Sequence, residues 1–418
     1  MKPWWNPEPQ MSTTAGTATT VETTNSRLES AGIVSLCLFV GALQLSIALS
    51  AVFITVTLGL WIAILMSNGE RLELPDVFWP LLAYAVLTLF SVAASSDPII
   101  SLTDSKELLL FLVVPLVYRL GRGRSAHTIA SIIISVGAVT AVFGIVQYGI
   151  LEFDNLGQRP LGSMGHYMTY SGLLMLVIGL AVARLLFGTS DRLWAGLVLP
   201  TLFVALALTL TRSAWVGTCV GVGLLFVIRD RRLLTAVPVI AVLFFGLAPQ
   251  TVIDRAYSAF DLQDPTNRDR FAMARAGVRM IRDYPLTGVG PDMVQEVYPA
   301  YKDAGGINEV NPHLHNVPLH IAAERGLPAV AVWLWFIVTV ARKLRLCLKD
   351  PKSKALAAGG LAALLSMLGA GMFEYNFGDS EFLMLLLVLL TLPIAVTQPD
   401  GTTEQQQKAQ GQTASAAA

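Results

Sequence analysis

Long apolar runs occupy most of the chain between residues 31 and 397, and short polar loops separate them. Several runs reach the ~17–25 residues that an α-helix needs to cross a bilayer. The pattern therefore predicts an all-α polytopic membrane protein with about twelve transmembrane helices. The predicted spans are residues 31–65 (as two short helices), 77–94, 108–120, 127–150, 167–187, 193–210, 213–228, 233–248, 327–340, 356–372 and 382–396.

One long polar segment, residues 249–326, interrupts this apolar pattern. We expect it to form one large, mainly helical loop outside the membrane, with transmembrane helices 1–9 in residues 31–248 and helices 10–12 in residues 327–397. The Ser- and Thr-rich residues 1–30 and the Gln- and Ala-rich residues 398–418 are expected to be disordered tails.

Basic residues set the expected orientation, because short cytoplasmic loops carry an excess of Lys and Arg. If the N-terminus is cytoplasmic, the inner loops hold most of the basic residues, and the short outer loops hold Lys106, Arg159 and Arg212. The long polar loop then faces the periplasm or the cell exterior.

Composition supports the membrane class and argues against one kind of partner. Hydrophobic residues make up 54% of the chain and charged residues 14%, whereas a soluble protein carries ~25% charged residues. The 29 basic and 29 acidic residues balance, which argues against a nucleic-acid partner. The three cysteines lie in or beside apolar runs without a metal-binding spacing, so neither a disulfide framework nor a cysteine metal site is expected.

The strongest candidate for chemistry is the sequence PHLHN at residues 312–316. His315 is the candidate base, because an imidazole titrates near neutrality and can accept a proton from a hydroxyl. Asn316 could orient His315 or hold a sugar hydroxyl. His313 can share a site with His315 only if the backbone is extended or just entering a helix, and Pro312 fits such a helix start. The alternative is a structural pair of interfacial histidines. A metal site is less favoured, because no Cys, Asp or Glu cluster accompanies the pair.

Arginines in the long loop form a second candidate. On a helix over residues 267–283, four of them lie on one stripe, and Arg270 points away from it. Such a stripe could meet phosphates, but we favour a lipid-facing or solvated surface. Arg270 is the stronger candidate for a ligand contact because it leaves the stripe. The stripe residues are Arg268, Arg275, Arg279 and Arg282.

Arg159 and Arg212 lie at the predicted outer ends of spans. Each is either a lipid anchor whose side chain snorkels to the interface or part of a clamp for a lipid diphosphate. A polyanionic-lipid transporter would need ionisable residues deep within the spans, and nearly none are present, so an enzyme is favoured over a transporter.

The order of several motifs resembles the O-antigen ligase family, whose superfamily includes O-antigen polymerases and protein O-oligosaccharyltransferases. The motifs are RPLG before a span, TRSAW opening a pair of helices, MIRDYPLTGVG in the large loop and HLHNVPLHIAAERGLPA leading into a helix. The resemblance covers roughly residues 31–396 and is most specific in the HN-containing motif with its following ERG.

The resemblance implies His315 as the catalytic base and Arg159, Arg212 and Arg270 as substrate-binding residues, with His313 and Asn316 beside them. The family usually has a tryptophan shortly after the loop arginine, where this chain has Ala274. That departure leaves Arg268 or Arg275 as substitutes for Arg270.

The resemblance also implies an activity and a location. The enzyme would be a metal-independent, inverting glycosyltransferase without a cofactor, of the GT-C-like type. The donor would be a glycan on undecaprenyl diphosphate, and the acceptor a sugar hydroxyl of lipid A–core. The protein would lie among the lipids of the Gram-negative inner membrane with its site facing the periplasm. O-antigen polymerase or protein O-oligosaccharyltransferase activity is the alternative, and no oligomeric state is implied.

Overall fold

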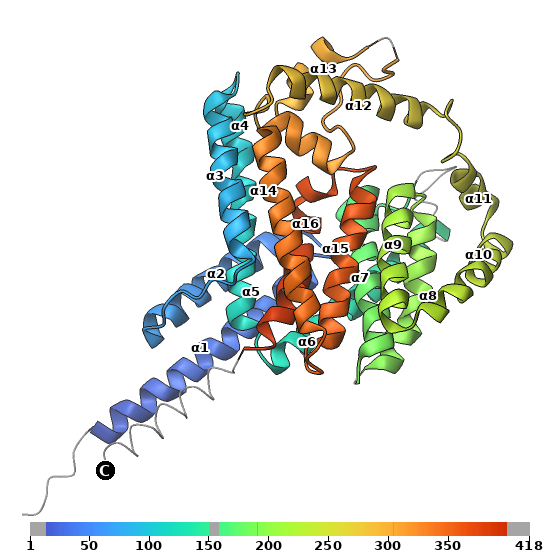
Figure 1. Cartoon of the computed structure of the whole chain (residues 1–418). Helices are drawn as coiled ribbons and strands as arrows, with labels where there is room; N and C mark the ends of the chain where they lie inside the picture. Colours follow the sequence, from blue (N-terminus) through green and yellow to red (C-terminus); the bar gives the residue numbers. More distant parts are fainter. Residues whose placement is uncertain (1–13, 150–158, 190, 304, 399–418) are drawn as a thin grey trace, which may run out of the picture.

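The computed structural model describes residues 14–149, 159–189, 191–303 and 305–398, and these residues contain helices and no strand. Figure 1 shows a bundle of long helices with a helical arch above one end. The α-helices are α1 (Thr14–Ala42), α2 (Ile47–Asn68), α3 (Phe78–Ala94), α4 (Pro98–Asp104), α5 (Val113–Leu120), α6 (Arg124–Gly149), α7 (Tyr167–Phe187), α8 (Arg192–Leu208), α9 (Arg212–Arg229), α10 (Ala236–Leu247), α11 (Gln250–Tyr257), α12 (Pro265–Asp283), α13 (Val294–Tyr301), α14 (Val317–Cys347), α15 (Lys354–Gly371) and α16 (Ser380–Ala395). Short 3₁₀ helices are η1 (Ser105–Leu112), η2 (Gly162–Met164), η3 (Arg231–Thr235) and η4 (Asn376–Gly378).

Six of the described helices are long and apolar enough to cross a membrane: α2, α6, α7, α9, α14 and α15. Three shorter apolar helices, α3, α8 and α16, have 16 or 17 residues. The expectation of an all-α multi-pass membrane protein is confirmed, while the number of about twelve spans remains a prediction.

The core of the bundle is formed by α7 and α15, whose most apolar windows are 83% and 72% buried. Small residues let neighbouring helices approach them closely. A Cβ atom on Gly221 of α9 would lie 2.1 Å from Ser366 Oγ of α15, so only glycine fits there. Close contacts of this kind replace the hydrophobic driving force that helices lack inside lipid.

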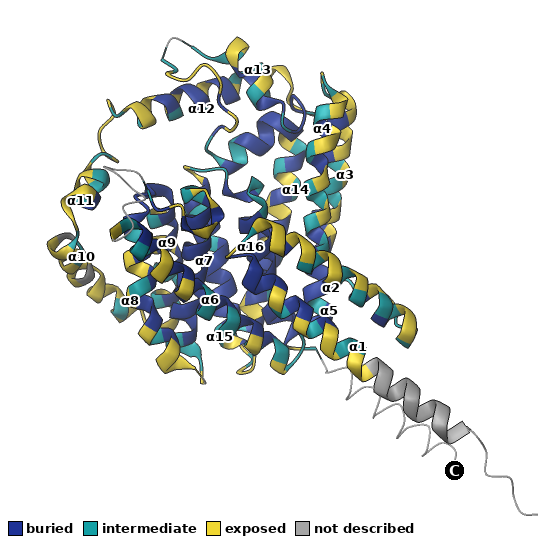
Figure 2. Cartoon of the chain, turned by 180° about the vertical axis from the view of Figure 1, so that it is seen from behind, coloured by how far each residue is buried: buried dark blue, intermediate teal, exposed yellow. Residues whose placement is uncertain are grey.

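Other helices leave apolar side chains exposed. The apolar window of α2 is only 22% buried, and Figure 2 shows exposed residues along α10 and α11. Val52 and Ile62 of α2 and Val242 of α10 are examples of large exposed apolar side chains. A bilayer would cover the apolar faces of α2 and α10, whereas their exposure to water would be unfavourable.

The polar segment 249–326 forms the arch. It contains α11, α12, α13 and the first turns of α14, and Figure 1 shows α12 and α13 lying across one end of the bundle. The arch has its own small core, in which Met273 and Met280 of α12 pack with Val294 and Tyr298 of α13 and with Leu314. The prediction of a mainly helical segment here agrees with the observed helices.

Helix α14 breaks at Gly326, which has φ 79° and ψ 168°. Leu327 N–H donates outside the helix, and Pro328 has no N–H. The carbonyl oxygens of Ala323 and Glu324 therefore lose their helical donors. Ala323 and Glu324 are buried, and a buried backbone group without a partner is costly, so this break needs partners from elsewhere.

Residues 285–290, here called the strap, supply those partners by running alongside the break. A Cβ atom on Gly326 would lie 2.2 Å from Leu286 O, and one on Gly288 would lie 2.1 Å from the Glu324 carbonyl carbon, so both positions require glycine. Backbone groups of the break and of the strap are therefore each other's hydrogen-bond partners. Their hydrogen bonds run from Val289 N–H to Ala323 O (2.8 Å), from Gly290 N–H to Glu324 O (2.9 Å) and from Leu327 N–H to Pro285 O (2.9 Å).

Some boundaries differ from the sequence predictions. Helix α1 begins at Thr14, inside residues 1–30 for which composition predicted disorder, because a helix propagates cheaply from an existing nucleus. The predicted span 108–120 is divided between η1 and α5, since Pro115 cannot donate the bond that would join them. Residues 1–13 and 399–418 lie outside the described residues.

Candidate active site

The HLHN segment is held at the start of α14 by Asn316. Its Oδ1 accepts a hydrogen bond from Leu319 N–H (2.9 Å) as a helix N-cap, and its Nδ2 donates to Met372 O at the end of α15 (3.1 Å). The helix begins at Val317, so the expectation that Pro312 marks the helix start is wrong by several residues. The residues before Asn316 are not helical, and the Leu314 N–H group donates to a side chain, His320, instead of to a helix carbonyl.

His315 lies directly before this cap with φ +48°, in the left-handed region. A non-glycine residue in such a conformation costs on the order of 1–3 kcal/mol and persists only where its surroundings hold it. The side chain is 20% exposed. The predicted base is thus presented on a tight turn rather than on a helix.

Glu374, in the segment between α15 and α16, holds the His315 ring. Its Oε1 lies 2.9 Å from His315 Nδ1. Burial raises the pKa of Glu374, but the hydrogen bond with His315 and the charge of Arg270 outweigh it, so the pKa lies below its usual value. The ionised carboxylate accepts from Nδ1–H, which leaves Nε2 with a lone pair. Sequence reasoning missed Glu374. The only signal was an acidic residue just beyond a predicted span.

The two other histidines lie beside His315. The ring centroids of His313 and His315 are 6.2 Å apart, and those of His313 and His320 are 6.0 Å apart. Leu314 N–H donates to His320 Nδ1 (3.3 Å), and α14 begins only at Val317. The segment is therefore not helical but about to enter a helix, which meets the condition for His313 and His315 to share a site. Burial and the neighbouring His320 lower the pKa of His313 to about 4, so His313 is neutral near pH 7.

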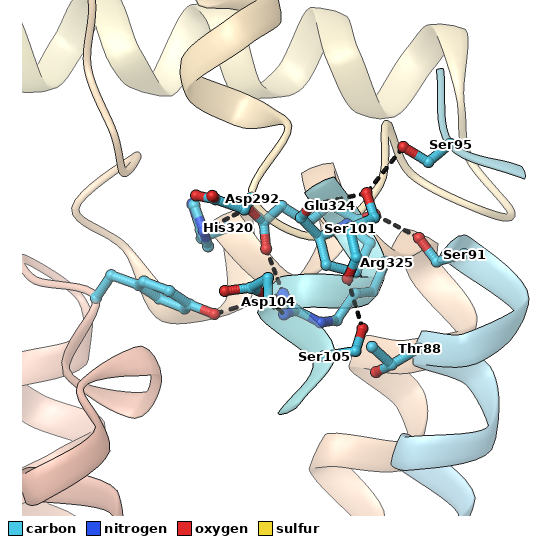
Figure 3. Close-up of polar contacts among 12 residues, drawn as sticks. Thr88, Ser91, Ser95, Ser101, Asp104, Ser105, Asp292, His320, Glu324 and Arg325 are labelled. Atoms are coloured by element: carbon cyan, nitrogen blue, oxygen red, sulfur yellow. Dashed lines mark hydrogen bonds and ion pairs between the residues drawn. The ribbon is translucent and has the colours of Figure 1, made fainter. Parts of the chain in front are cut away.

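A buried polar network includes His320, Glu324, Arg325 and Asp104 (Figure 3). His320 and Glu324 are 1% and 3% exposed, and His320 Nε2 lies 3.2 Å from Glu324 Oε1. Arg325 pairs with the second oxygen of Glu324, with Asp104 Oδ2 (3.4 Å) and with the Tyr375 hydroxyl (3.5 Å). Neutral His320 therefore donates from Nε2 to Glu324 and accepts from Leu314, one residue before His315.

Arg212 joins the bundle to the arch. It begins α9, and its Nη1 donates to Ser258 Oγ (3.1 Å) while its Nη2 donates to Asn267 Oδ1 (3.0 Å). Asp264 Oδ1 lies 3.7 Å from Nη2, and Asp264 also caps α12 through Thr266 N–H (2.9 Å). The planar guanidinium thus bridges two elements of the arch at once.

Arg159, Arg255 and Arg270 lie near Arg212 in one basic group. Burial lowers the pKa of Arg255, and the charges of Arg159 and Arg212 lower it further. Burial likewise lowers the pKa of Arg270. The charge of Glu374 raises this pKa, whereas the charges of Arg255 and Arg159 lower it further. Like charges held together in this way favour an anionic ligand between them. The structure brings together all three predicted arginines and adds Arg255, which the sequence reasoning had not assigned to the site.

The arginine stripe of α12 faces away from this group. Arg275 Nε lies 2.6 Å from Asp303 Oδ2, and Arg279 lies 3.8 Å from the same carboxylate. Arg268 and Arg282 are exposed. The stripe is therefore an exposed face of α12 that pairs with Asp303, and Arg270 rather than a stripe residue interacts with Glu374.

A cavity of about 320 Å³ adjoins the histidines. Among its lining residues are the carboxylates Glu107, Glu374, Asp379 and Glu381 and the rings of His166 and His313. Both side-chain neighbours of His315, His313 and Glu374, therefore lie on its wall. Among the described residues, no group of three or more His, Cys, Asp or Glu side chains could hold a metal ion.

Replacing Arg212 with lysine should loosen the arch. A lysine cannot bridge Ser258 and Asn267 together, and a hydrogen bond to a charged group contributes about 1.5–3 kcal/mol. We expect faster limited proteolysis after residue 250 and weaker binding of an anionic lipid substrate. The exposed Arg231→Lys is the control. Equal proteolysis and equal substrate binding in the two variants would reduce Arg212 to a lipid anchor.

The O-antigen ligase family model matches residues 197–334, about a third of the chain. The matched range runs from within α8 to the middle of α14. It contains Arg212, Arg270 and His315, whereas Arg159 and Glu374 lie outside it. Comparison with curated proteins finds no match. The match therefore covers the arch, the HLHN segment and the helix break.

Proposed function

The chain belongs to the O-antigen ligase family, and from this premise we propose that it transfers a glycan from undecaprenyl diphosphate to a sugar hydroxyl of lipid A–core. The family implies, in general terms, a membrane enzyme with a lipid-linked glycan donor and a lipid acceptor. The observation that carries the finer proposal is the His315–Glu374 pair at 2.9 Å next to a group of arginines. In this proposal, residues 249–326 lie on the periplasmic side of the inner membrane.

The arginines take the donor diphosphate. Arg159, Arg212, Arg255 and Arg270 act on one another electrostatically, and a diphosphate would relieve that repulsion while accepting their hydrogen bonds. As the glycan leaves, negative charge grows on the diphosphate. A well-placed group that stabilises such charge lowers a barrier by about 3–4 kcal/mol. Arg270 is best placed because its Nε is buried and lacks a hydrogen-bond partner.

His315 activates the acceptor. Its Nε2 takes the proton from the acceptor hydroxyl while the hydroxyl oxygen attacks the anomeric carbon. The bond between that carbon and the diphosphate oxygen breaks, and its electron pair leaves with the lipid diphosphate. Glu374 orients the ring and stabilises the imidazolium, which then releases its proton to water. Direct displacement of this kind inverts the anomeric centre.

Transfer by the purified protein in lipid nanodiscs tests the proposal. The donor is undecaprenyl diphosphate carrying an O-antigen glycan, and the acceptors are lipid A–core, a second lipid-linked glycan and a hydroxyl-bearing peptide. We expect product on lipid A–core alone and no effect of a chelator. Product on the lipid-linked glycan alone would indicate a polymerase, and product on the peptide alone a protein transferase. Vectorial movement of donor without transfer would indicate a transporter.

Replacing Glu374 with glutamine should lower the maximal rate and change its pH dependence. The amide keeps the size of the side chain but no longer stabilises the imidazolium. We therefore expect the acid limb of the rate profile to move to lower pH, with the maximal rate reduced by about 10²-fold or more. The exposed Glu309→Gln is the control. A reduced rate with an unshifted acid limb would assign Glu374 a structural role only.

A further inference from the structure

We propose that the cavity lined by Glu107, His166, His313, Asn376, Asp379 and Glu381, here called the acidic cavity, binds an acceptor sugar that carries no phosphate. The inference rests on the proposed function and deepens it, because it names a substrate class for the second side of the site. Its support comes from the location, size, unpaired acceptors and charge of the cavity.

The acidic cavity lies where an acceptor must arrive. Its wall includes His313 and Glu374, and both lie beside the His315 ring, with a centroid distance of 6.2 Å for His313 and an Nδ1–Oε1 distance of 2.9 Å for Glu374. Its volume of about 320 Å³ falls at the lower end of the ~300–1,000 Å³ typical of small-molecule sites. One sugar unit fits such a space, and its neighbour along the acceptor then reaches His315.

The acidic cavity has hydrogen-bond acceptors without donors. Asn376 is 8% exposed, and its Oδ1 is buried with no hydrogen-bond partner, while its Nδ2 is used by Met367 O (3.3 Å). Glu374 Oε2 is likewise buried and unpaired. Glu107 has no hydrogen bond or ion pair within the described part of the chain. Buried acceptors require donors, and a sugar offers a hydroxyl donor on nearly every carbon.

Charge excludes a phosphorylated sugar from the same space. The carboxylates of Glu107, Glu374, Asp379 and Glu381 line it together. Burial raises the pKa of Glu107 to about 7, so this group is partly ionised near pH 7, whereas the pKa of Glu374 lies below its usual value and Glu374 is ionised. His313 is neutral near pH 7 because its pKa is about 4. A phosphate would meet like charges there, which is unfavourable. The basic group beyond Glu374 has the opposite preference. The two sides of His315 therefore sort a diphosphate donor from an uncharged acceptor sugar.

The test is binding of deacylated core oligosaccharide to the purified full chain by titration calorimetry. The probe is prepared with its phosphates and after chemical dephosphorylation. Wild-type protein should bind the dephosphorylated probe about 10-fold more tightly. Glu107→Lys should remove or reverse that preference. Lys106→Glu changes a neighbouring exposed residue that does not line the cavity, and it should keep the preference.

Asn376→Leu provides a second variant, which has nearly the same size as asparagine but lacks the acceptor Oδ1, and it should weaken binding of either probe. The proposal is overturned if wild-type protein binds neither probe, if it binds both equally, or if Glu107→Lys behaves like Lys106→Glu. Transfer to lipid A–core, measured on the same preparations, separates the two levels. If transfer is intact but binding is unselective, only the proposal for the acidic cavity is contradicted. If binding is selective but no transfer occurs, only the proposed function is contradicted.

Discussion

Replacing His315 with alanine lowers the rate of glycan transfer by about 10²–10⁴-fold, the range that a positioned general base contributes. In the proposed mechanism the variant loses the nitrogen that would accept the hydroxyl proton, while Asn316 still caps α14 and the arginines proposed to bind the donor diphosphate are unchanged. Donor affinity should therefore stay near that of the wild type. The measurement is single-turnover transfer with purified protein, together with a separate donor-binding titration.

The matched control is His127→Ala. His127 lies in α6, at the end of the bundle near Lys352, and its removal should leave the transfer rate unchanged. Because alanine is strained in the left-handed conformation of residue 315, His315→Asn serves as a second variant that tolerates this conformation. If either His315 variant transfers at a near-normal rate, the base assignment is wrong.

The second large effect is on stability and follows from Arg325. It is the cation that neutralises Glu324 and Asp104 within the buried network. Arg325→Met leaves these carboxylates without a counter-charge, and breaking a buried pair in this way typically costs about 3–5 kcal/mol. We expect a large drop in the midpoint of thermal unfolding, followed by loss of transfer, because His320 then no longer holds the backbone beside His315.

The pH dependence of that variant gives a sharper readout. Burial already raises the pKa of Asp104 above its usual value, although Arg325 lowers it. Removing Arg325 raises it further, so the folded state binds more protons than the unfolded state, and stability should rise as the pH falls. Arg275→Met, which breaks an exposed pair with Asp303, is the control and should barely change the midpoint. Equal midpoints for the two variants would contradict the role given to the network.

The apolar pattern predicted the helical class and the position of the arch in the sequence, because the length and periodicity of apolar runs are local properties of the chain. It could not predict the break in α14. Gly326 and Pro328 were visible, but the break is stable only because the strap, far away in sequence, satisfies the freed carbonyl oxygens. The same applies to α5, whose start reflects Pro115 and its packing rather than hydropathy.

The candidate site was predicted as far as residue chemistry alone allows. His315 and the arginines stood out because bases and fixed charges are rare in an apolar chain. Glu374 is separated from His315 by 59 positions, so nothing in the local pattern joins them. Arg255 was visible as a charge, but its inclusion depends on how α11 folds against the start of α9, where its Nε donates to Leu210 O (3.3 Å).

The paired break and strap decide which parts of the molecule can move independently. Lifting the arch away from the bundle at the α14 end would cost three backbone hydrogen bonds at once. The first turns of α14, the histidines and the strap consequently travel as one rigid body. At the opposite end of the arch, near Pro249, the described links to the bundle are side-chain hydrogen bonds, from Arg212 to Ser258 and from Arg255 to Leu210 O, so a movement of the arch that keeps the break and the strap together would have to begin there.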